Sequence, residues 1–238
     1  MSRIAIVTGG SRGIGKAIAE KLRNNYKVIT CSRKSSDSLN NYVCDVTNPE
    51  EVRSFSDSIK EKYGNIDLLV NNAGGCAKRD YLFSEISIDE WQRIVNQNLN
   101  SVFLVTSAFY DIINPWGSII NISSTLAHTP LKGKSLYSVS KSGIETLTKN
   151  LALELAERRI RVNCVSPGPT DTDLLRQHFI KNGELDQDKY DQFSESMLLG
   201  RLVIPEDVAN LVYFLSSGGS KMITGQTIAV DGGRLLKW

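Results

Sequence analysis

Tyr137 and Lys141 are the side chains of this 238-residue sequence whose types and spacing point most directly to chemistry. They are four residues apart in a segment of helical character, so both lie on one face of the predicted helix. A free tyrosine has a pKa near ~10, too high for proton exchange at neutral pH, but a neighbouring ammonium favours the phenolate. The pair is therefore a candidate general acid and base, although tyrosine and lysine at this spacing also occur on ordinary helices.

A glycine-rich segment near the N-terminus gives a second chemical signal. Residues 8–15 read Thr-Gly-Gly-Ser-Arg-Gly-Ile-Gly, between a β-branched run and a helical pattern over 16–22. Gly9 suits a tight turn, Gly13 permits close approach of a pyrophosphate, and Gly15 permits a helix to pack closely on a strand. Free N–H groups at the start of the helix favour phosphate. The segment predicts a dinucleotide site, although its spacing is Gly-x3-Gly-x-Gly and not Gly-x-Gly-x-x-Gly.

The end of the second predicted strand favours NADP(H) over NAD(H). An acidic residue there would bind the ribose diol of NAD, but the strand ends Thr-Cys-Ser-Arg and the next carboxylate is Asp37. Arg33 at the strand end and Arg12 in the glycine turn could instead bind the 2′-phosphate through their planar guanidinium groups. The alternative is that both are solvated surface arginines.

A parallel sheet is needed to bring these residues together, and the hydrophobic pattern predicts one. Short β-branched runs alternate with longer helical segments, which is typical of a parallel sheet with helices on both faces. Capping boxes over 47–50 and 87–90 predict two helix starts, whereas 33–41 is polar and predicts a loop or one turn. The predicted strands are 4–8, 27–31, 41–43, 68–71, 118–122, 161–165 and 227–230.

The composition argues against several other classes of protein. With 28 basic and 26 acidic residues the net charge is +2, and no basic block suggests a nucleic-acid partner. No apolar run approaches the ~20 residues that span a membrane, and the N-terminal apolar run is too short for a signal peptide. Four dispersed cysteines and two histidines show no metal or disulfide pattern, so we expect a cytoplasmic protein without a metal site. Since no linker or repeat divides residues 1–238, we expect a single domain.

Several motifs together resemble the short-chain dehydrogenase/reductase family over nearly the whole chain. They are Thr8–Gly15, Asn71-Asn-Ala-Gly74, Asn98, Ser124, Tyr137-x-x-x-Lys141, Pro167-Gly168 with Thr172, and the segments 200–209 and 224–233. Within this family the sequence most resembles 3-oxoacyl-[acyl-carrier-protein] reductases. The resemblance implies an α/β protein of the Rossmann type, with a doubly wound, seven-stranded parallel sheet and helices on both faces.

The resemblance also implies roles in hydride transfer between a nicotinamide and a carbonyl. Tyr137 would protonate the carbonyl oxygen and Lys141 would also hold the nicotinamide ribose. Ser124, which the family's spacing selects over Ser123, would polarise the carbonyl, and Asn98 would hold a water that links Lys141 to solvent. The implied cofactor-binding residues are Gly9, Ser11, Arg12, Gly13, Ile14, Gly15, Arg33, Asp45, Val46, Asn72, Ala73, Gly74, Tyr137, Lys141, Pro167, Gly168, Thr170 and Thr172. Among these, Asp45 would accept a hydrogen bond from adenine or merely flank a helix, and Thr172 would fix the carboxamide.

The substrate is less constrained than the reaction. By resemblance, 98–141 is the catalytic core and 173–199 the substrate lid. A group of cationic side chains in the surrounding loops predicts a solvated rim, with binding of an anionic substrate as the alternative; it comprises Lys78, Arg79, His128, Lys132 and Lys134.

Three departures from the carrier-protein reductases favour a second substrate class, and the first is the shortened polar segment 33–41 after the second predicted strand. Carrier-protein reductases tend to have a basic residue in the loop before the fifth strand, but loop 113–117 has none, and Arg158 and Arg159 compensate only partly. They also have a glycine shortly after the catalytic serine, near the position that His128 occupies here. A dehydrogenase or reductase of a sugar-derived, polyol or other small hydroxy/keto substrate is therefore the alternative. A non-catalytic NADP(H)-sensing protein is disfavoured because the tyrosine and lysine are both present. The resemblance also implies a homotetramer.

Overall fold

A single parallel sheet organises the protein. The computed structural model describes residues 2–34, 40–77, 79–181 and 183–236. Its seven-stranded sheet has the order β3-β2-β1-β4-β5-β6-β9, with all neighbours parallel. The strands are β1 (Ile4–Thr8), β2 (Lys27–Ser32), β3 (Asn40–Val43), β4 (Ile66–Asn71), β5 (Ile113–Ile122), β6 (Arg161–Pro167) and β9 (Thr227–Val230). The order reverses between β1 and β4, which confirms the predicted doubly wound α/β fold of one domain.

Helices cover both faces of the sheet. The helices are α1 (Gly13–Leu22) and α8 (Pro205–Ser216) on one face, and α2 (Pro49–Tyr63), α4 (Ser101–Phe109) and α5 (Ser135–Glu154) on the other. In β1, Ala5 and Val7 pack against the first pair of helices while Ile4 and Ile6 pack against the other three. Because both faces are buried, the strand is apolar throughout and does not alternate with polar residues.

The helix starts show where local sequence signals compete. The predicted capping box over 47–50 is wrong, because Asn48 caps α2 and its Oδ1 accepts from the N–H groups of Glu50 and Glu51 at 3.0 and 3.3 Å. Pro49 takes the first helical position, where a missing N–H costs nothing. The start predicted for α3 (Ile88–Val95) is confirmed, since Ser87 Oγ accepts from the N–H of Glu90 at 3.2 Å.

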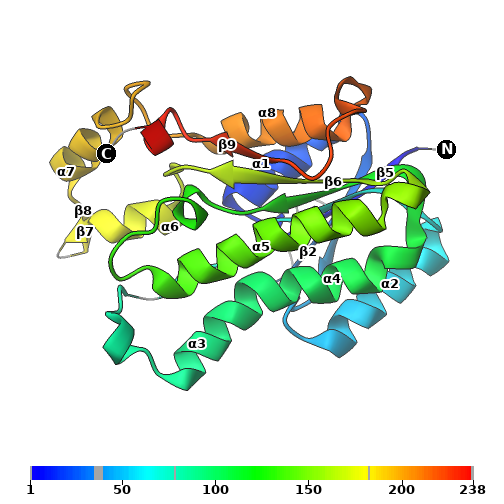
Figure 1. Ribbon diagram of the computed structural model, residues 1–238, viewed down its shortest axis with the longest axis horizontal. Helices are drawn as coiled ribbons and strands as arrows, with labels where there is room; N and C mark the ends of the chain where they lie inside the picture. Colours follow the sequence, from blue (N-terminus) through cyan, green and yellow to red (C-terminus); the bar gives the residue numbers. More distant parts are fainter. Residues whose placement is uncertain (1, 35–39, 78, 182, 237–238) are drawn as a thin grey trace.

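Two further segments bear on the site. Residues 35–39, within the predicted loop between β2 and β3, lie outside the described residues. At the carboxyl ends of the strands the chain forms α6 (Asp173–Arg176), an antiparallel pair of β7 (Ile180–Lys181) and β8 (Glu184–Leu185), and α7 (Gln187–Glu195), which lie at the left of Figure 1. These elements gather around a small apolar cluster of Tyr190, Met197 and Leu202.

Candidate active site

A cleft of about 1910 Å³ lies at the carboxyl edge of the sheet. This is the edge at which open parallel sheets bind ligands. All the predicted cofactor-binding residues line it, and so do three of the four predicted catalytic residues, Ser124, Tyr137 and Lys141. The fourth, Asn98, lies fully buried behind the wall. The fold therefore brings together side chains that are more than 100 positions apart in sequence.

The turn between β1 and α1 has the shape of a phosphate-binding loop. Gly9 and Gly13 have φ of +67° and +52°, which glycine adopts without strain. A Cβ on Gly15 would lie 2.2 Å from the carbonyl oxygen of Gly9 and 2.3 Å from Nδ2 of Asn72, so no larger residue fits there. Arg12, the residue before α1, provides no side-chain cap, so N–H groups at this helix start are available to a ligand.

Asn72 stabilises the glycine turn, a role that the sequence did not predict. Its Nδ2 donates to the carbonyl oxygens of Thr8 and Gly9 at 2.9 and 3.2 Å, and so braces the glycine turn. In return, Thr8 Oγ1 accepts from the backbone N–H groups of Asn72 and Ala73, both at 3.0 Å. These bonds fix the end of β4 against the end of β1 and hold the two sides of the turn in register.

Cations lie at the end of the cleft where β2 finishes. Arg12 and Arg33 are both exposed and line the cleft, and no carboxylate within the described residues forms an ion pair with either. Lys34, which the sequence argument did not single out, lines the same part of the cleft. Asp45 fits both of its proposed roles, because it lines the cleft while its Oδ1 accepts from the N–H and hydroxyl of Thr47 at 2.9 and 2.8 Å.

Tyr137 and Lys141 lie on successive turns of α5, with Ser124 opposite. The Lys141 side chain is only 4% exposed, and its Nζ lies 5.6 Å from the centre of the Tyr137 ring and donates to the carbonyl oxygen of Ile122 at 2.9 Å. Burial lowers the pKa of Lys141 to about 8. Tyr137 and Lys141 therefore lie on one face of α5, as their spacing predicts.

The pKa of Tyr137 is raised, whereas the sequence predicts that a neighbouring ammonium favours the phenolate. Burial raises it above the ordinary value and the Cys76 thiol adds to this, while a hydrogen bond with Ser124 acts in the opposite direction. Loss of hydration is the largest of these causes, and the Lys141 ammonium donates to the backbone carbonyl oxygen of Ile122. In the protein alone Tyr137 therefore holds its proton, as a general acid must.

Asn98 lies in a π-helical turn, Asn96–Asn100, between α3 and α4. Its Oδ1 accepts from the N–H of Gly75 at 2.9 Å and its Nδ2 donates to the carbonyl oxygen of Gly75 at 3.0 Å. A Cβ on Gly74 would lie 2.7 Å from Oδ1 of Asn98 and 3.6 Å from Nζ of Lys141, so these three residues are contiguous. Helical irregularities of this kind are frequent at functional sites.

Residues 168–172, which follow β6, form another wall of the cleft. Gly168 packs against the backbone of Asp231, where a Cβ would lie only 2.8 Å from its Cα. The Thr170 hydroxyl donates to the carbonyl oxygen of Gly168 at 2.9 Å, which closes the loop. Thr172 reaches across to the glycine turn, since its Cγ2 would lie 3.6 Å from a Cβ on Gly13.

The predicted group of cations does not form a ring around the cleft. Lys134 lines it but pairs with Asp80 at 2.5 Å, Arg79 pairs with Glu85 at 3.2 Å, and Lys132 is not among the lining residues. Lys78 lies outside the described residues. Of this group, His128 and Lys134 line the cleft, together with apolar side chains and with polar ones that the sequence did not indicate: Leu126, Leu131, Leu174, Leu175, Phe179, Phe193, Arg93, Gln97, His178 and Arg234.

The described residues contain no candidate metal site and no candidate membrane-spanning helix. Among them, no three histidine, cysteine or carboxylate side chains are grouped so as to hold a metal ion. None of the helices within those ranges combines the length and the hydropathy of a membrane span. All four cysteines are free thiols.

Comparison with known proteins identifies the family. A family model described as enoyl-(acyl carrier protein) reductase matches residues 9–234. The chain belongs to the short-chain dehydrogenase/reductase family. This confirms the resemblance found in the sequence and makes the protein a relative of oxidoreductases.

Family members with different printed activities are similar to the chain. The 3-oxoacyl-[acyl-carrier-protein] reductase FabG of Aquifex aeolicus is 37% identical over 248 residues, covering 97% of this chain and 96% of the relative. The ligand-free aldohexose dehydrogenase of Thermoplasma acidophilum has a TM-score of 0.94 and 34% identity, covering 100% of this chain and 95% of that one. An actinorhodin polyketide ketoreductase with NADPH has a TM-score of 0.89 and 31% identity, covering 98% and 97%.

Proposed function

We propose that the protein is an NADP(H)-dependent oxidoreductase that interconverts a ketone and a secondary alcohol, with Tyr137 as general acid and base. The observation that carries the proposal is the convergence of Ser124, Tyr137 and Lys141 in the same cleft as the glycine turn and two arginines. One end of the cleft offers groups for a phosphorylated nucleotide and the other offers proton donors for a carbonyl. Membership of an oxidoreductase family supports this assignment.

The residues of the cleft fit a nicotinamide dinucleotide. The lack of a side chain at Gly13 and the uncapped start of α1 suit a pyrophosphate, and Arg12 and Arg33 suit the 2′-phosphate of NADP(H). Asp45 and Val46 would face the adenine, and Asn72, Ala73 and Gly74 the adenosine side. Ser11 and Ile14 would complete the phosphate end, with Pro167, Gly168, Thr170 and Thr172 around the nicotinamide. When bound, the cofactor supplies a hydride.

In the proposed mechanism, side chains of the protein supply and stabilise the transferred proton. The Tyr137 hydroxyl would donate a proton to the carbonyl oxygen while Ser124 donates a hydrogen bond to the same atom. The buried Lys141 ammonium would stabilise the phenolate that forms and hold the nicotinamide ribose. Because both polar groups of the Asn98 side chain bond to Gly75, Asn98 would hold the relay water through its backbone carbonyl.

Two substrate classes match different side chains of the cleft. A 3-oxoacyl thioester, as the name of the Aquifex relative suggests, would find apolar contacts at Leu126, Leu131 and Phe179. A sugar-derived, polyol or other small hydroxy/keto substrate, as the name of the Thermoplasma protein suggests, would find polar contacts at His128. Residues 173–199 would act as the lid in either case, and of the described cations predicted for this end Arg79 and Lys134 already pair with carboxylates.

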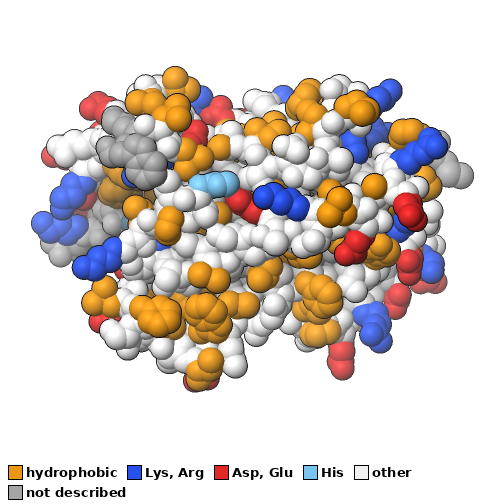
Figure 2. Space-filling model, in the orientation of Figure 1, with side chains coloured by type: hydrophobic (Ala, Val, Ile, Leu, Met, Phe, Trp, Pro, Cys, Tyr) orange, Lys and Arg blue, Asp and Glu red, His pale blue; other side chains and the backbone are white. Residues whose placement is uncertain are grey.

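A homotetramer is the assembly that we propose. Figure 2 shows hydrophobic side chains gathered over the part of this face where Figure 1 places α3, α4 and α5. On these helices, Phe103 of α4 is 59% exposed and Leu153 of α5 is 76% exposed. Apolar surface of this kind on two adjacent helices marks an interaction site. We place the protein in the cytoplasm, because its four cysteines are free thiols.

The test is a set of initial rates with NADPH or NADH against acetoacetyl thioesters, sugars and diketones. We expect turnover with NADPH that falls by at least about a hundredfold in Tyr137→Phe, the usual scale of general acid catalysis. Tight NADPH binding with no turnover of any carbonyl, or of alcohols with NADP⁺, would instead support a non-catalytic NADP(H) sensor. A Tyr137→Phe variant as active as the wild type would contradict the assigned mechanism.

A further inference from the structure

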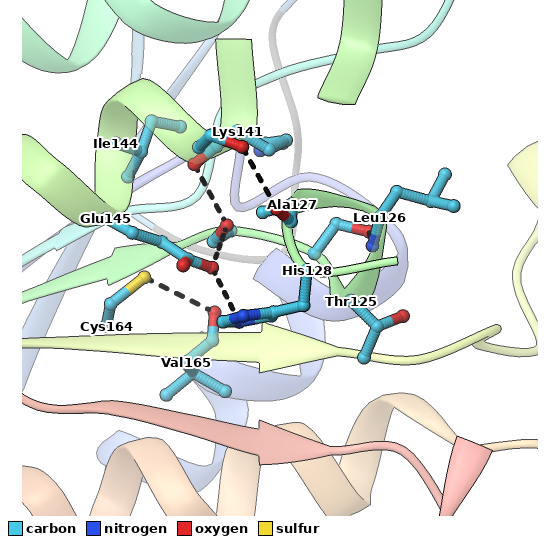
Figure 3. Close-up of polar contacts among 12 residues, drawn as sticks. Thr125, Leu126, Ala127, His128, Lys141, Ile144, Glu145, Cys164 and Val165 are labelled. Carbon is cyan, nitrogen blue, oxygen red and sulfur yellow. Dashed lines mark hydrogen bonds and ion pairs between the residues drawn. The ribbon is translucent and has the colours of Figure 1, made fainter. Parts of the chain in front are cut away.

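His128 and Glu145 form a polar contact beside the site that the proposed mechanism does not use. Nε2 of His128 lies 3.1 Å from Oε1 of Glu145. The Glu145 side chain is only 12% exposed, whereas that of His128 is 40% exposed and lines the cleft. Figure 3 shows the ring and the carboxylate directed toward each other, His128 from the segment after β5 and Glu145 from α5. A largely buried carboxylate thus holds an imidazole that lines the cleft.

The contacts of Glu145 determine which ring nitrogen of His128 carries the hydrogen. Its Oε1 also accepts from the Ser123 hydroxyl at 2.8 Å, and Ser123 Oγ lies 3.1 Å from the carbonyl oxygen of Lys141. Because Oε1 of Glu145 acts as an acceptor toward Ser123, Nε2 of His128 is the ring nitrogen that carries a hydrogen and donates to it. In the imidazole form with a single ring hydrogen, Nδ1 carries none. Nδ1 is then a hydrogen-bond acceptor.

Nδ1 of His128 is available to a ligand. Within the described residues no group hydrogen bonds to it, while the backbone N–H of His128 is fixed by the carbonyl oxygen of Thr125 at 3.0 Å. His128 follows Ser124 by four positions and lines the same cleft as Ser124 and Tyr137. An acceptor at this place matches a hydroxyl group and offers no hydrogen to a second carbonyl.

We propose that His128 is a specificity-determining residue whose Nδ1 accepts a hydrogen bond from a hydroxyl next to the reacting carbonyl, with Glu145 as the positioning residue that fixes the ring. The inference rests on the proposed ketone reductase function and chooses between its two substrate classes. It favours α-hydroxy ketones, including sugar-derived ones, because a 3-oxoacyl thioester carries no hydroxyl beside its ketone. Ser123 would matter through Glu145, without contact to the substrate.

The test compares hydroxyacetone with 2-butanone, which differ by a hydroxyl in place of a methyl group. The measured quantity is the ratio of kcat/KM for the two ketones with NADPH, in which general losses of activity cancel. His128→Phe keeps a ring but removes both nitrogens, and we expect the ratio to fall about tenfold, the loss of one hydrogen bond. Glu145→Gln should lower it as well, by a smaller factor, because a neutral amide oxygen accepts from Nε2 more weakly than a carboxylate and fixes the ring less firmly. Glu154→Gln, the same substitution at an exposed position of α5, is the matched control and should leave the ratio at the wild-type value.

The possible outcomes separate this inference from the proposed function. An unchanged ratio in His128→Phe, or an equal fall in Glu154→Gln, overturns the role of His128 while leaving the reductase function intact. Wild-type reduction of 2-butanone but not of hydroxyacetone has the same meaning. If the wild type reduces neither ketone, the proposed function fails and this inference fails with it. Should His128→Phe not fold, as judged by its circular dichroism, the ratio in Glu145→Gln decides.

Discussion

Because its ammonium is buried, Lys141 is expected to lower the unfolding free energy of the protein, although the proposed mechanism requires it. Its pKa falls from an ordinary 10.5 to about 8 because the ammonium loses hydration. At ~1.36 kcal/mol for each pKa unit, this corresponds to about 3 kcal/mol of unfolding free energy at pH 7. The hydrogen bond to Ile122 that a replacement would lose offsets about 1 kcal/mol or more. We therefore expect Lys141→Met to raise the unfolding free energy by about 1–2 kcal/mol at pH 7, while abolishing turnover.

The pH dependence identifies the cause of this gain. Between pH 8 and 10.5 unfolded Lys141 keeps a proton that the folded residue has released, so the unfolded state binds more protons and wild-type stability rises with pH. The advantage of Lys141→Met should consequently shrink by about 2 kcal/mol between pH 7 and pH 9.5. Above pH 10.5 the lysine is neutral in both states and its desolvation no longer separates the two proteins.

The assay is denaturant unfolding of both proteins at the two pH values. Lys149→Met, the same substitution at an exposed position of α5, is the control and should change stability by at most about 0.5 kcal/mol at either pH. A Lys141→Met protein that is less stable than the wild type at pH 7 would refute the reasoning. A gain that stays constant from pH 7 to pH 9.5 would show that packing, and not the buried charge, is responsible.

Three further predictions concern the cofactor end of the cleft and the surface. Gly15→Ala should weaken NADPH binding by at least about tenfold in a fluorescence titration, since its Cβ would lie 2.2 Å from the oxygen of Gly9; wild-type affinity would contradict the packing argument. Replacing Arg12 and Arg33 together by alanine should raise KM for NADPH at least about tenfold with little effect on KM for NADH, while an equal effect on both cofactors would mean that the arginines do not bind the 2′-phosphate. Cys76, alone among the four cysteines in being partly exposed, should be the one that iodoacetamide labels in mass spectrometry, slowly because burial raises its pKa, and NADPH should protect it; labelling of buried Cys164 at the same rate would contradict this.

The sheet could be predicted because its signals are local and repeated. Ile4–Thr8 and Thr227–Val230 have the predicted bounds, since each is a short β-branched run next to a clear turn. β5 was predicted to start at residue 118 but starts at Ile113, because Pro115 and Gly117 interrupt its pattern. β7 and β8 were missed because strands of two residues show no periodicity.

The candidate site shows a different limit. Spacing and resemblance place Ser124, Tyr137 and Lys141 in one cleft, but they do not reveal how each polar group is satisfied. The brace from Asn72 to the glycine turn and the contact of Glu145 with His128 join segments distant in sequence. Such contacts depend on strand register and helix placement, which only the folded chain determines.

A buried polar network beneath the site explains how α5 holds a charge that costs stability. Asn71 Nδ2 donates to Thr106 Oγ1 at 3.0 Å and to Asn121 Oδ1 at 2.9 Å, and Asn121 Nδ2 donates to Thr148 Oγ1 at 2.9 Å. These bonds connect β4, β5, α4 and α5, and each requires one particular placement of the helices on the sheet. An apolar contact would tolerate sliding by part of a turn, whereas a displaced amide would lose its partners inside the protein. Because Thr148 lies about two turns after Lys141 on α5, the same bonds fix where the lysine enters the cleft.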